Sequence, residues 1–459
     1  MKKIVASVGL VAVGVSGLQA ASIPGFGGEG EKPWTISATL RGFYDDNINS
    51  VTDNSKSRQD SFGFEVSPSV TFGLNMDRTT IGFAYLYSLK YYDTKPLGNS
   101  DHYDQTHTFN VDFGHAISDR LRLDIRDSFV IGQEPDTLRA GNTFDTFQRI
   151  SGDNIRNYGT IDLTYQATPK LGFTLGYQNT YVDYADDHFK VANAIAIDTN
   201  VPPTVIGDVQ PSHSGTLDRI EHNPHLDGRL TILPTTIGVI GYAYREIDYT
   251  ADELISGSYL GVDPAHPSAA DVTDGLRSDV RNSQSHYGYV GVEHSFRPNL
   301  TGTARAGARY TEYPNDPNGT SEVSPYANLS LRWVYAPESF LEVGGSYDLS
   351  ATDLFSVSST DPTDITLDAQ TASGWASVTH RITPRLFGSL TGQVQNSQYH
   401  GGSLDGQSDM FYVIGLNFEY RFNPHLSAHA GYNYDRLDSD LPQRSFDRNR
   451  VYVGVTATY

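Results

Sequence analysis

The chain has 459 residues, a formal net charge of −21 and no cysteine. The negative charge argues against a nucleic-acid partner, because nucleic acid requires a basic surface. The lack of thiols excludes disulfides and a lipid anchored through cysteine.

The N-terminus is typical of a secretory signal. Lys2 and Lys3 form a charged start, residues 4–17 form a short apolar stretch, and residues 18–20 fit a cleavage site. The apolar stretch is too short and too rich in glycine for a spanning helix, and no later window reaches 18 consecutive apolar residues. We therefore expect export and no membrane-spanning helices, with a retained N-terminal anchor as the alternative.

Two kinds of connection alternate strictly along the rest of the chain. Eight are short, and several place Pro before a basic or polar residue and Leu, as in Thr168-Pro-Lys-Leu171 and Thr383-Pro-Arg-Leu386; Pro suits such turns because its φ is fixed. Nine are longer and acidic, near residues 45–60, 94–103, 135–153, 185–215, 251–281, 313–322, 355–364, 400–407 and 439–446. This count predicts about 18 strands, and sorting short turns from long loops is typical of a transmembrane barrel.

The runs between these connections alternate in polarity with a period of two, as strands with two different faces do. Residues 81–91, 171–178 and 412–421 each place aromatic and aliphatic side chains on one face and mostly small or polar ones on the other. The chain has 29 Tyr and 21 Phe against 3 Met, an excess that aromatic belts at two membrane interfaces would explain. Residues 217–232 fit least well, because Pro224 and several charges lie in their interior.

The last nine residues alternate most regularly. The side chains of Val451, Val453, Val455 and Tyr459 fall on one face, and small or polar side chains fall mostly on the other. Together with the repeated turns and the stretch Phe43-Tyr-Asp-Asp-Asn47, this strand resembles the putative β-barrel porin family of bacterial outer-membrane proteins. The resemblance implies that the last strand closes the barrel and is recognised by the barrel-assembly machinery.

Charged residues alternate with apolar ones on several strands, and we expect them to face the interior. An Arg that faces lipid at mid-bilayer costs about 2–4 kcal/mol. The candidate lumen residues are Arg122, Asp124, Arg126, Arg305, Arg309, Glu342, Asp348, Asn417, Glu419 and Arg421. They could select among ions or sugars, or simply form a hydrated, ion-paired lumen, which is the simpler interpretation of any one of them.

The sequence contains no Gly-x-Ser-x-Gly elbow and no His-Glu-x-x-His motif. His222 and His225 are three apart, so they would point to opposite faces of a strand and form no metal pair. Residues 315–319 with Glu322, and residues 361–364, offer oxygen ligands for calcium, but ordinary turns explain both. We predict no enzyme, no metal site and no cofactor; acidic loops that bind divalent cations at the cell surface are an alternative to simple solubility.

These patterns predict an all-β protein: a transmembrane antiparallel up-and-down barrel of about 18 strands in the outer membrane, with short periplasmic turns and long extracellular loops. Residues 1–20 would be the signal, residues 21–32 a short lead and residues 33–459 the barrel.

The leading function is a porin-like channel for passive diffusion of small hydrophilic solutes. A polysaccharide export pore and a non-conducting surface scaffold or adhesin are the alternatives. The expected partners are outer-membrane lipid and lipopolysaccharide, the assembly machinery, and the solute or polysaccharide. The loops 185–215 and 251–281 could fold inward and constrict the pore.

Overall fold

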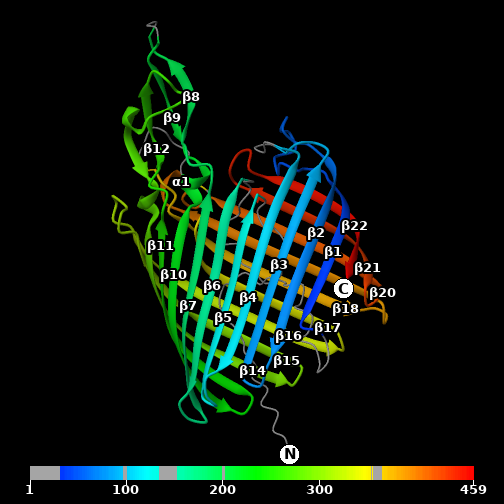
Figure 1. Cartoon of the computed structure of the whole chain (residues 1–459). Coiled ribbons are helices and arrows are strands. Elements are labelled where there is room, and N and C mark those ends of the chain that lie inside the picture. The colour runs from blue at the N-terminus through cyan, green and yellow to red at the C-terminus, as the bar shows by residue number, and fades with distance from the viewer. Residues whose placement is uncertain (1–31, 97–100, 134–151, 199–201, 353, 355–363) are drawn as a thin grey trace, which may run out of the picture.

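Eighteen antiparallel strands follow one another in chain order around a ring (Figure 1). The computed structural model describes residues 32–96, 101–133, 152–198, 202–352, 354 and 364–459, so the expected signal and nearly all of the expected lead lie outside the described residues. The barrel strands are β1 (Trp34–Asp45), β2 (Ser61–Asn75), β3 (Thr79–Tyr92), β4 (Tyr103–Ala116), β5 (Leu121–Gly132), β6 (Asn154–Gln166), β7 (Leu171–Tyr184), β10 (Arg219–Leu233), β11 (Thr236–Tyr249), β14 (Ser283–Arg297), β15 (Leu300–Glu312), β16 (Ser321–Ala336), β17 (Ser339–Ser350), β18 (Asp368–Arg381), β19 (Leu386–His400), β20 (Ser408–Asn423), β21 (Leu426–Ser439) and β22 (Phe446–Thr458).

The last strand closes the ring by pairing with the first. Val453 of β22 lies opposite Gly42 of β1, and Val455 lies opposite Leu40. Every barrel strand therefore has two neighbours, and the sheet leaves no unpaired edge in lipid, where each unpaired backbone group would cost several kcal/mol. The predicted closed, all-β barrel of about 18 strands is confirmed.

The two classes of connection lie at opposite ends of the barrel. Eight connections have two to four residues, and nine are longer. In the repeated turn, Thr168 donates its N–H to the Leu171 carbonyl and accepts the Leu171 N–H on its hydroxyl, each at 3.0 Å. Thr383 and Leu386 make the same pair of bonds, at 3.1 and 3.0 Å. The threonine hydroxyl thus completes the turn that proline begins, which explains the recurrence of the motif.

The strand expected to be poorest is complete. β10 includes Pro224, which lies opposite Tyr177 of β7. Pairing with β11 holds one register on both sides of the proline, from His222 opposite Glu246 to His225 opposite Ala243. Proline cannot donate a backbone hydrogen bond, but the strands on either side hold β10 in place. The charged residues that interrupt the alternation of β10, such as Arg219, Glu221 and Asp227, point into the barrel.

The barrel is apolar outside and polar inside. Leu40, Ile240, Val290 and Val453 are among the exposed outward side chains. Most of the inward positions carry charged, hydroxyl or amide groups, or glycine. Among the described residues, no helix is long and apolar enough to cross a membrane.

The two longest loops pair with each other. Their strands β8 (Lys190–Ala196), β9 (Val205–Gln210), β12 (Leu254–Gly261) and β13 (Val272–Arg277) form a second sheet in the order β13-β12-β9-β8. This sheet rises beyond the rim of the barrel (Figure 1). The expectation that both loops fold inward is therefore wrong for most of their length, because strand pairing between the loops satisfies their backbone groups outside the lumen.

Short helical segments lie in the loops. The helix α1 (His213–Leu217) and the 3-10 turn η2 (Ser278–Arg281) lie at the bases of the two longest loops, just before β10 and β14. The 3-10 turn η1 (Ala269–Asp271) lies between β12 and β13, and η3 (Gly402–Leu404) belongs to a separate loop. Arg281 is buried and donates hydrogen bonds to the carbonyl oxygens of Thr216 and Thr352, and its guanidinium lies 4.6 Å from the centre of the Tyr249 ring. One arginine thus joins three loops at the rim.

Candidate functional site

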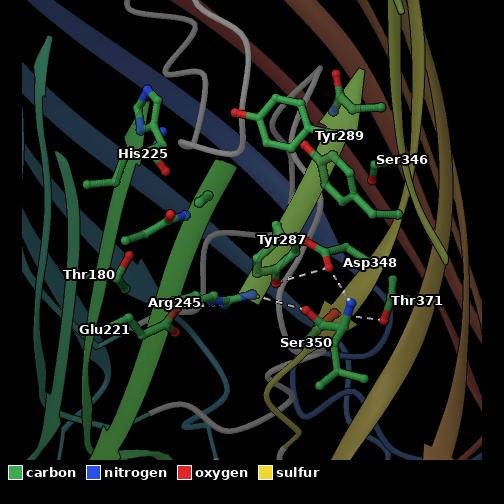
Figure 2. Close-up of a pocket in the computed structure, with 16 residues that line it drawn as sticks. Thr180, Glu221, His225, Arg245, Tyr287, Tyr289, Ser346, Asp348, Ser350 and Thr371 are labelled. Carbon is green, nitrogen blue, oxygen red and sulfur yellow. Dashed lines mark hydrogen bonds and ion pairs between the residues drawn. The ribbon is translucent and has the colours of Figure 1, made fainter. Parts of the chain in front are cut away.

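A cavity of about 90 Å³ lies against the inner wall of the barrel (Figure 2). Its lining residues belong to the halves of their strands that are nearer the long loops. Its walls come from seven strands, β7, β10, β11, β14, β16, β17 and β18. The lining residues are Gln178, Thr180, Glu221, Asn223, His225, Ala243, Arg245, Tyr287, Tyr289, Tyr326, Asn328, Ser346, Asp348, Leu349, Ser350 and Thr371. Apolar rings beside convergent polar groups are typical of a small-molecule site.

Three tyrosines form the aromatic part of the cavity. Tyr287 and Tyr326 meet edge to face, with ring centres 5.4 Å apart, and Tyr289 and Tyr326 lie 5.7 Å apart. All three are buried against Ala243. Edge-to-face pairs suit the quadrupoles of aromatic rings, so the rings hold each other in fixed positions.

Glycine makes room for one of these rings. Gly241 of β11 lies between Asp227 of β10 and Tyr289 of β14 in the strand register. A Cβ on Gly241 would overlap both the Tyr289 ring and the Asp227 carboxylate. Without that Cβ, the Tyr289 hydroxyl reaches across β11 and donates a 2.6 Å hydrogen bond to Asp227.

The charges around the cavity are paired with each other. Arg305 lies 2.9 Å from Asp227, and Arg309 lies 2.7 Å from Asp348 and 3.1 Å from Glu322. The wall nearer the long loops holds a second group, in which Glu221 accepts hydrogen bonds from Arg245 at 2.6 Å and from Arg219 at 2.8 Å. Figure 2 shows Glu221 and Arg245 side by side and Asp348 beside Tyr287. Compact pairs of this kind leave little net field in the cavity.

The other predicted lumen residues lie on inward positions away from the cavity. Of the ten, only Asp348 lines it, while Arg305 and Arg309 contact its tyrosines from behind. The rest form local contacts: Arg122 with Asp124 at 2.6 Å, Arg126 with Asp112 at 3.9 Å, Glu342 with Arg332 at 2.8 Å, Glu419 with Arg421 at 3.0 Å, and Asn417, which accepts a hydrogen bond from the Tyr452 hydroxyl at 3.1 Å.

The last strand presents its valines outward. Val451, Val453 and Val455 are exposed on the outer face, and Tyr459 is exposed beyond the end of β22. The Tyr459 ring lies 5.8 Å from the ring of Trp34, across the seam that closes the barrel.

The histidines and acidic stretches considered for metals have other contacts. His225 points into the cavity with Asp162 3.6 Å away, whereas His222 is on the outer face and bonds to the Tyr177 hydroxyl. Glu322 faces inward to Arg309. Residues 361–363 lie outside the described residues. Within the described part of the chain, no three His, Cys, Asp or Glu side chains are grouped so as to hold a metal ion.

A buried carboxyl secures the base of the first long loop above the cavity. Asp218, just outside β10, accepts hydrogen bonds from the Tyr184 N–H at 2.7 Å and from the Ser214 hydroxyl at 2.5 Å. Burial raises the pKa of Asp218 to about 6, although both hydrogen bonds act in the opposite direction. Nearby, burial also raises the pKa of Glu253, which bonds to the Ser212 hydroxyl that caps α1.

Sequence reasoning did not single out the three tyrosines or the neutral side chains beside them. Outward aromatic belts and inward tyrosines look alike in a strand pattern. One signal was present: Tyr287 and Tyr289 share their face with Glu293, which must avoid lipid. No comparable signal connects Tyr326 or Asn328 to them, because these residues belong to a different strand.

Residues 277–459 match the model of the family described as "Putative beta-barrel porin 2". The resemblance to this family is confirmed over those residues, and with it a porin-like channel in the outer membrane rather than an enzyme. No curated protein matches the chain.

Several solved outer-membrane proteins are similar to the chain at low identity. The outer membrane protein OpdK from Pseudomonas aeruginosa is 11% identical, with a TM-score of 0.43 over 93% of this chain and 99% of that chain. OccAB4 from Acinetobacter baumannii is 12% identical, with a TM-score of 0.40 over 94% and 99%. A BenF-like porin from Pseudomonas fluorescens Pf-5 is 10% identical, with a TM-score of 0.42 over 93% and 99%. A further structure of OpdK is one with vanillate.

Proposed function

We propose that this porin-like outer-membrane barrel lets small hydrophilic solutes diffuse passively through its lumen. The observation that carries the proposal is the contrast between the two faces of a closed 18-stranded sheet. The outer face suits lipid, and the inner face carries hydroxyl, amide and ion-paired groups that hold water. Barrels of 16–18 strands are wide enough to leave an aqueous channel.

The pairing of the inner charges supports passage of neutral or weakly charged solutes. Arg305 and Arg309, the most buried of the candidate lumen arginines, each lie within 3 Å of a carboxylate. Unpaired charges of one sign would create an electrostatic field in the lumen that attracts ions of the opposite charge. Compact ion pairs create only a weak field. The candidate lumen residues would then influence selectivity as a hydrated, paired surface.

Recordings from the full chain in planar bilayers test this function. A steady open conductance, together with swelling of liposomes in small neutral sugars, is the expected result. A correctly folded barrel that stays silent would favour the surface scaffold, and conductance that requires a polysaccharide-synthesis partner would favour export. Folding is checked by gel mobility before and after boiling, and the boiled protein is the matched inactive control.

We further propose that the outward residues of β22 are the signal for the assembly machinery. Val451, Val453 and Val455 form an exposed apolar row on the strand that closes the barrel. Outer-membrane lipid and lipopolysaccharide would be the natural surroundings of this face. Serine at all three positions should reduce the yield of assembled barrel in cells, whereas serine at the inward residue Thr456, which lies opposite Thr39, should reduce it less.

A further inference from the structure

We infer that the cavity in the inner wall is a binding site for a neutral, hydroxyl-rich solute of monosaccharide size, which is held there on its way through the lumen. The inference rests on the proposed channel function and adds the chemical class of the solute and its place of contact. Three features of the cavity carry it: its charges, its neutral polar groups and its rings.

The charged groups of the cavity already have partners. Glu221 is held between Arg245 and Arg219, and Asp348 accepts hydrogen bonds from Arg309 at 2.7 Å and from the Tyr287 hydroxyl at 3.2 Å. His225 has Asp162 beside it. An anion or a cation that entered would have to break one of these pairs, and breaking a buried pair leaves a charge without compensation. The cavity therefore disfavours charged solutes of either sign.

The neutral polar groups of the cavity, by contrast, can still form hydrogen bonds. Among the described residues, the buried carbonyl oxygen of Asn223 has no hydrogen-bond donor. The Thr180 hydroxyl, the Asn328 amide and the Tyr326 hydroxyl line the same cavity. An unsatisfied buried polar group is costly. Amides and hydroxyls both donate and accept, so together these four residues match the hydroxyl groups of a sugar, which also do both.

The tyrosine rings supply an apolar surface beside these groups. A pyranose ring carries hydroxyl groups around its edge and C–H groups on its faces, so it needs both kinds of contact. Tyr287, Tyr289 and Tyr326 are fixed by their mutual contacts and by the space above Gly241. A rigid aromatic surface loses little entropy when a solute binds to it.

The size of the cavity fits one small ring. Its volume of about 90 Å³ corresponds to space for several water molecules. It lies on the loop side of the barrel, below the segment held by Arg281. A solute entering past the long loops would meet this site before it reached the region of the short turns.

A charge series of sugars tests the inference on the full chain. D-glucose, D-glucuronate and D-glucosamine share the same ring and differ in charge, and vanillate adds an aromatic carboxylate. Binding is measured by saturation-transfer NMR on the refolded barrel in detergent and by interruptions of single-channel current in bilayers. Glucose is expected to bind, and glucuronate, glucosamine and vanillate are expected to bind at least about tenfold more weakly, since each would disturb a buried pair.

Two variants locate the site. Tyr326→Phe and Asn328→Ala each remove a neutral hydrogen-bonding group and should weaken glucose binding by about threefold to tenfold, the effect of one net hydrogen bond. The matched control is Asn433→Ala, because Asn433 lies opposite Arg450 on the inward face of β21 and does not line the cavity. All three proteins should show the same heat-modifiable mobility.

The outcomes separate the two proposals. Tighter binding of glucuronate, glucosamine or vanillate than of glucose would overturn the inference, as would glucose binding that Asn433→Ala weakens as much as Asn328→Ala. Conductance without detectable binding of any sugar would overturn the site and leave the channel standing. Glucose binding in detergent by a barrel that never conducts would overturn the channel and support the site.

Discussion

Removing the Asp227 carboxylate should destabilise the barrel strongly, because its partner Arg305 would remain as a buried, unpaired charge. Asp227 is 3% exposed and Arg305 is 7% exposed, with 2.9 Å between the charged groups. At an effective dielectric constant of about 20, two unit charges at that distance attract by about 6 kcal/mol before desolvation is counted. Loss of one partner of such a pair typically costs about 3–5 kcal/mol. The Tyr289 hydroxyl would lose its acceptor as well.

The measurement is equilibrium unfolding of the refolded barrel in detergent by guanidinium chloride, followed by tryptophan fluorescence. Asp227→Ala should lower the free energy of unfolding by about 3–5 kcal/mol, and the double variant Asp227→Ala with Arg305→Met should lower it by less, because no buried charge is left. The matched control is Arg421→Met, which removes a partly exposed pair with Glu419 worth about 0–1 kcal/mol. If Asp227→Ala costs no more than Arg421→Met, lumen water solvates Arg305 and the cavity is not a low-dielectric site.

Four other predictions follow from the same geometry. Leu416→Arg on the outer face should cost about 2–4 kcal/mol and reduce assembly yield far more than Asn417→Arg on the inner face, and equal yields would mean that the faces are assigned wrongly. Gly241→Ala should displace the Tyr289 ring from Asp227 and weaken glucose binding measured by NMR; unchanged binding would exclude Tyr289 from the site. The folded-state pKa of Asp218, about 6, lies above the value of about 3.9 in an unfolded chain, so its contribution to stability is complete below pH 4 and is lost as the pH rises through 6. Hydrogen exchange at α1 should therefore be slower at pH 5 than at pH 7 after correction for intrinsic rates, and Asp218→Asn should abolish that difference. The folded barrel should migrate differently on gels before and after boiling, and identical mobility would count against a closed barrel.

The number of strands and the two faces of most strands could be predicted from the sequence because both depend on local properties. The turn at Thr168 is completed by Leu171, three residues away. The outward row at Val451, Val453 and Val455 needs only a period of two. Even β10, with its interior proline, could be counted as a strand, because the connections on either side of it alternate in length like the rest.

The path of the two longest loops could not be predicted in this way. Residues 185–215 and 251–281 carry no motif that specifies a partner, and each alone offers only short strands. Their sheet forms because β9 and β12 meet across about 50 residues of sequence, with Ile206 opposite Leu260. The pairing of β7, β10, β11 and β14 brings these loops to neighbouring points on one rim.

The cavity, too, was decided by the tertiary structure. Asp227, Tyr289 and Arg305 belong to three strands, and the aspartate and the arginine are 78 positions apart in sequence. Each is an ordinary inward residue by its own pattern. They meet because the register of β10, β11 and β14 places Asp227, Gly241 and Tyr289 in one row, with Gly241 leaving the gap that Tyr289 crosses. Arg305 of β15 lies opposite Gly291, two residues beyond Tyr289 on the same face, and reaches Asp227 from there. Alternation along a strand determines which face a side chain takes, whereas the register between neighbouring strands decides what it meets there.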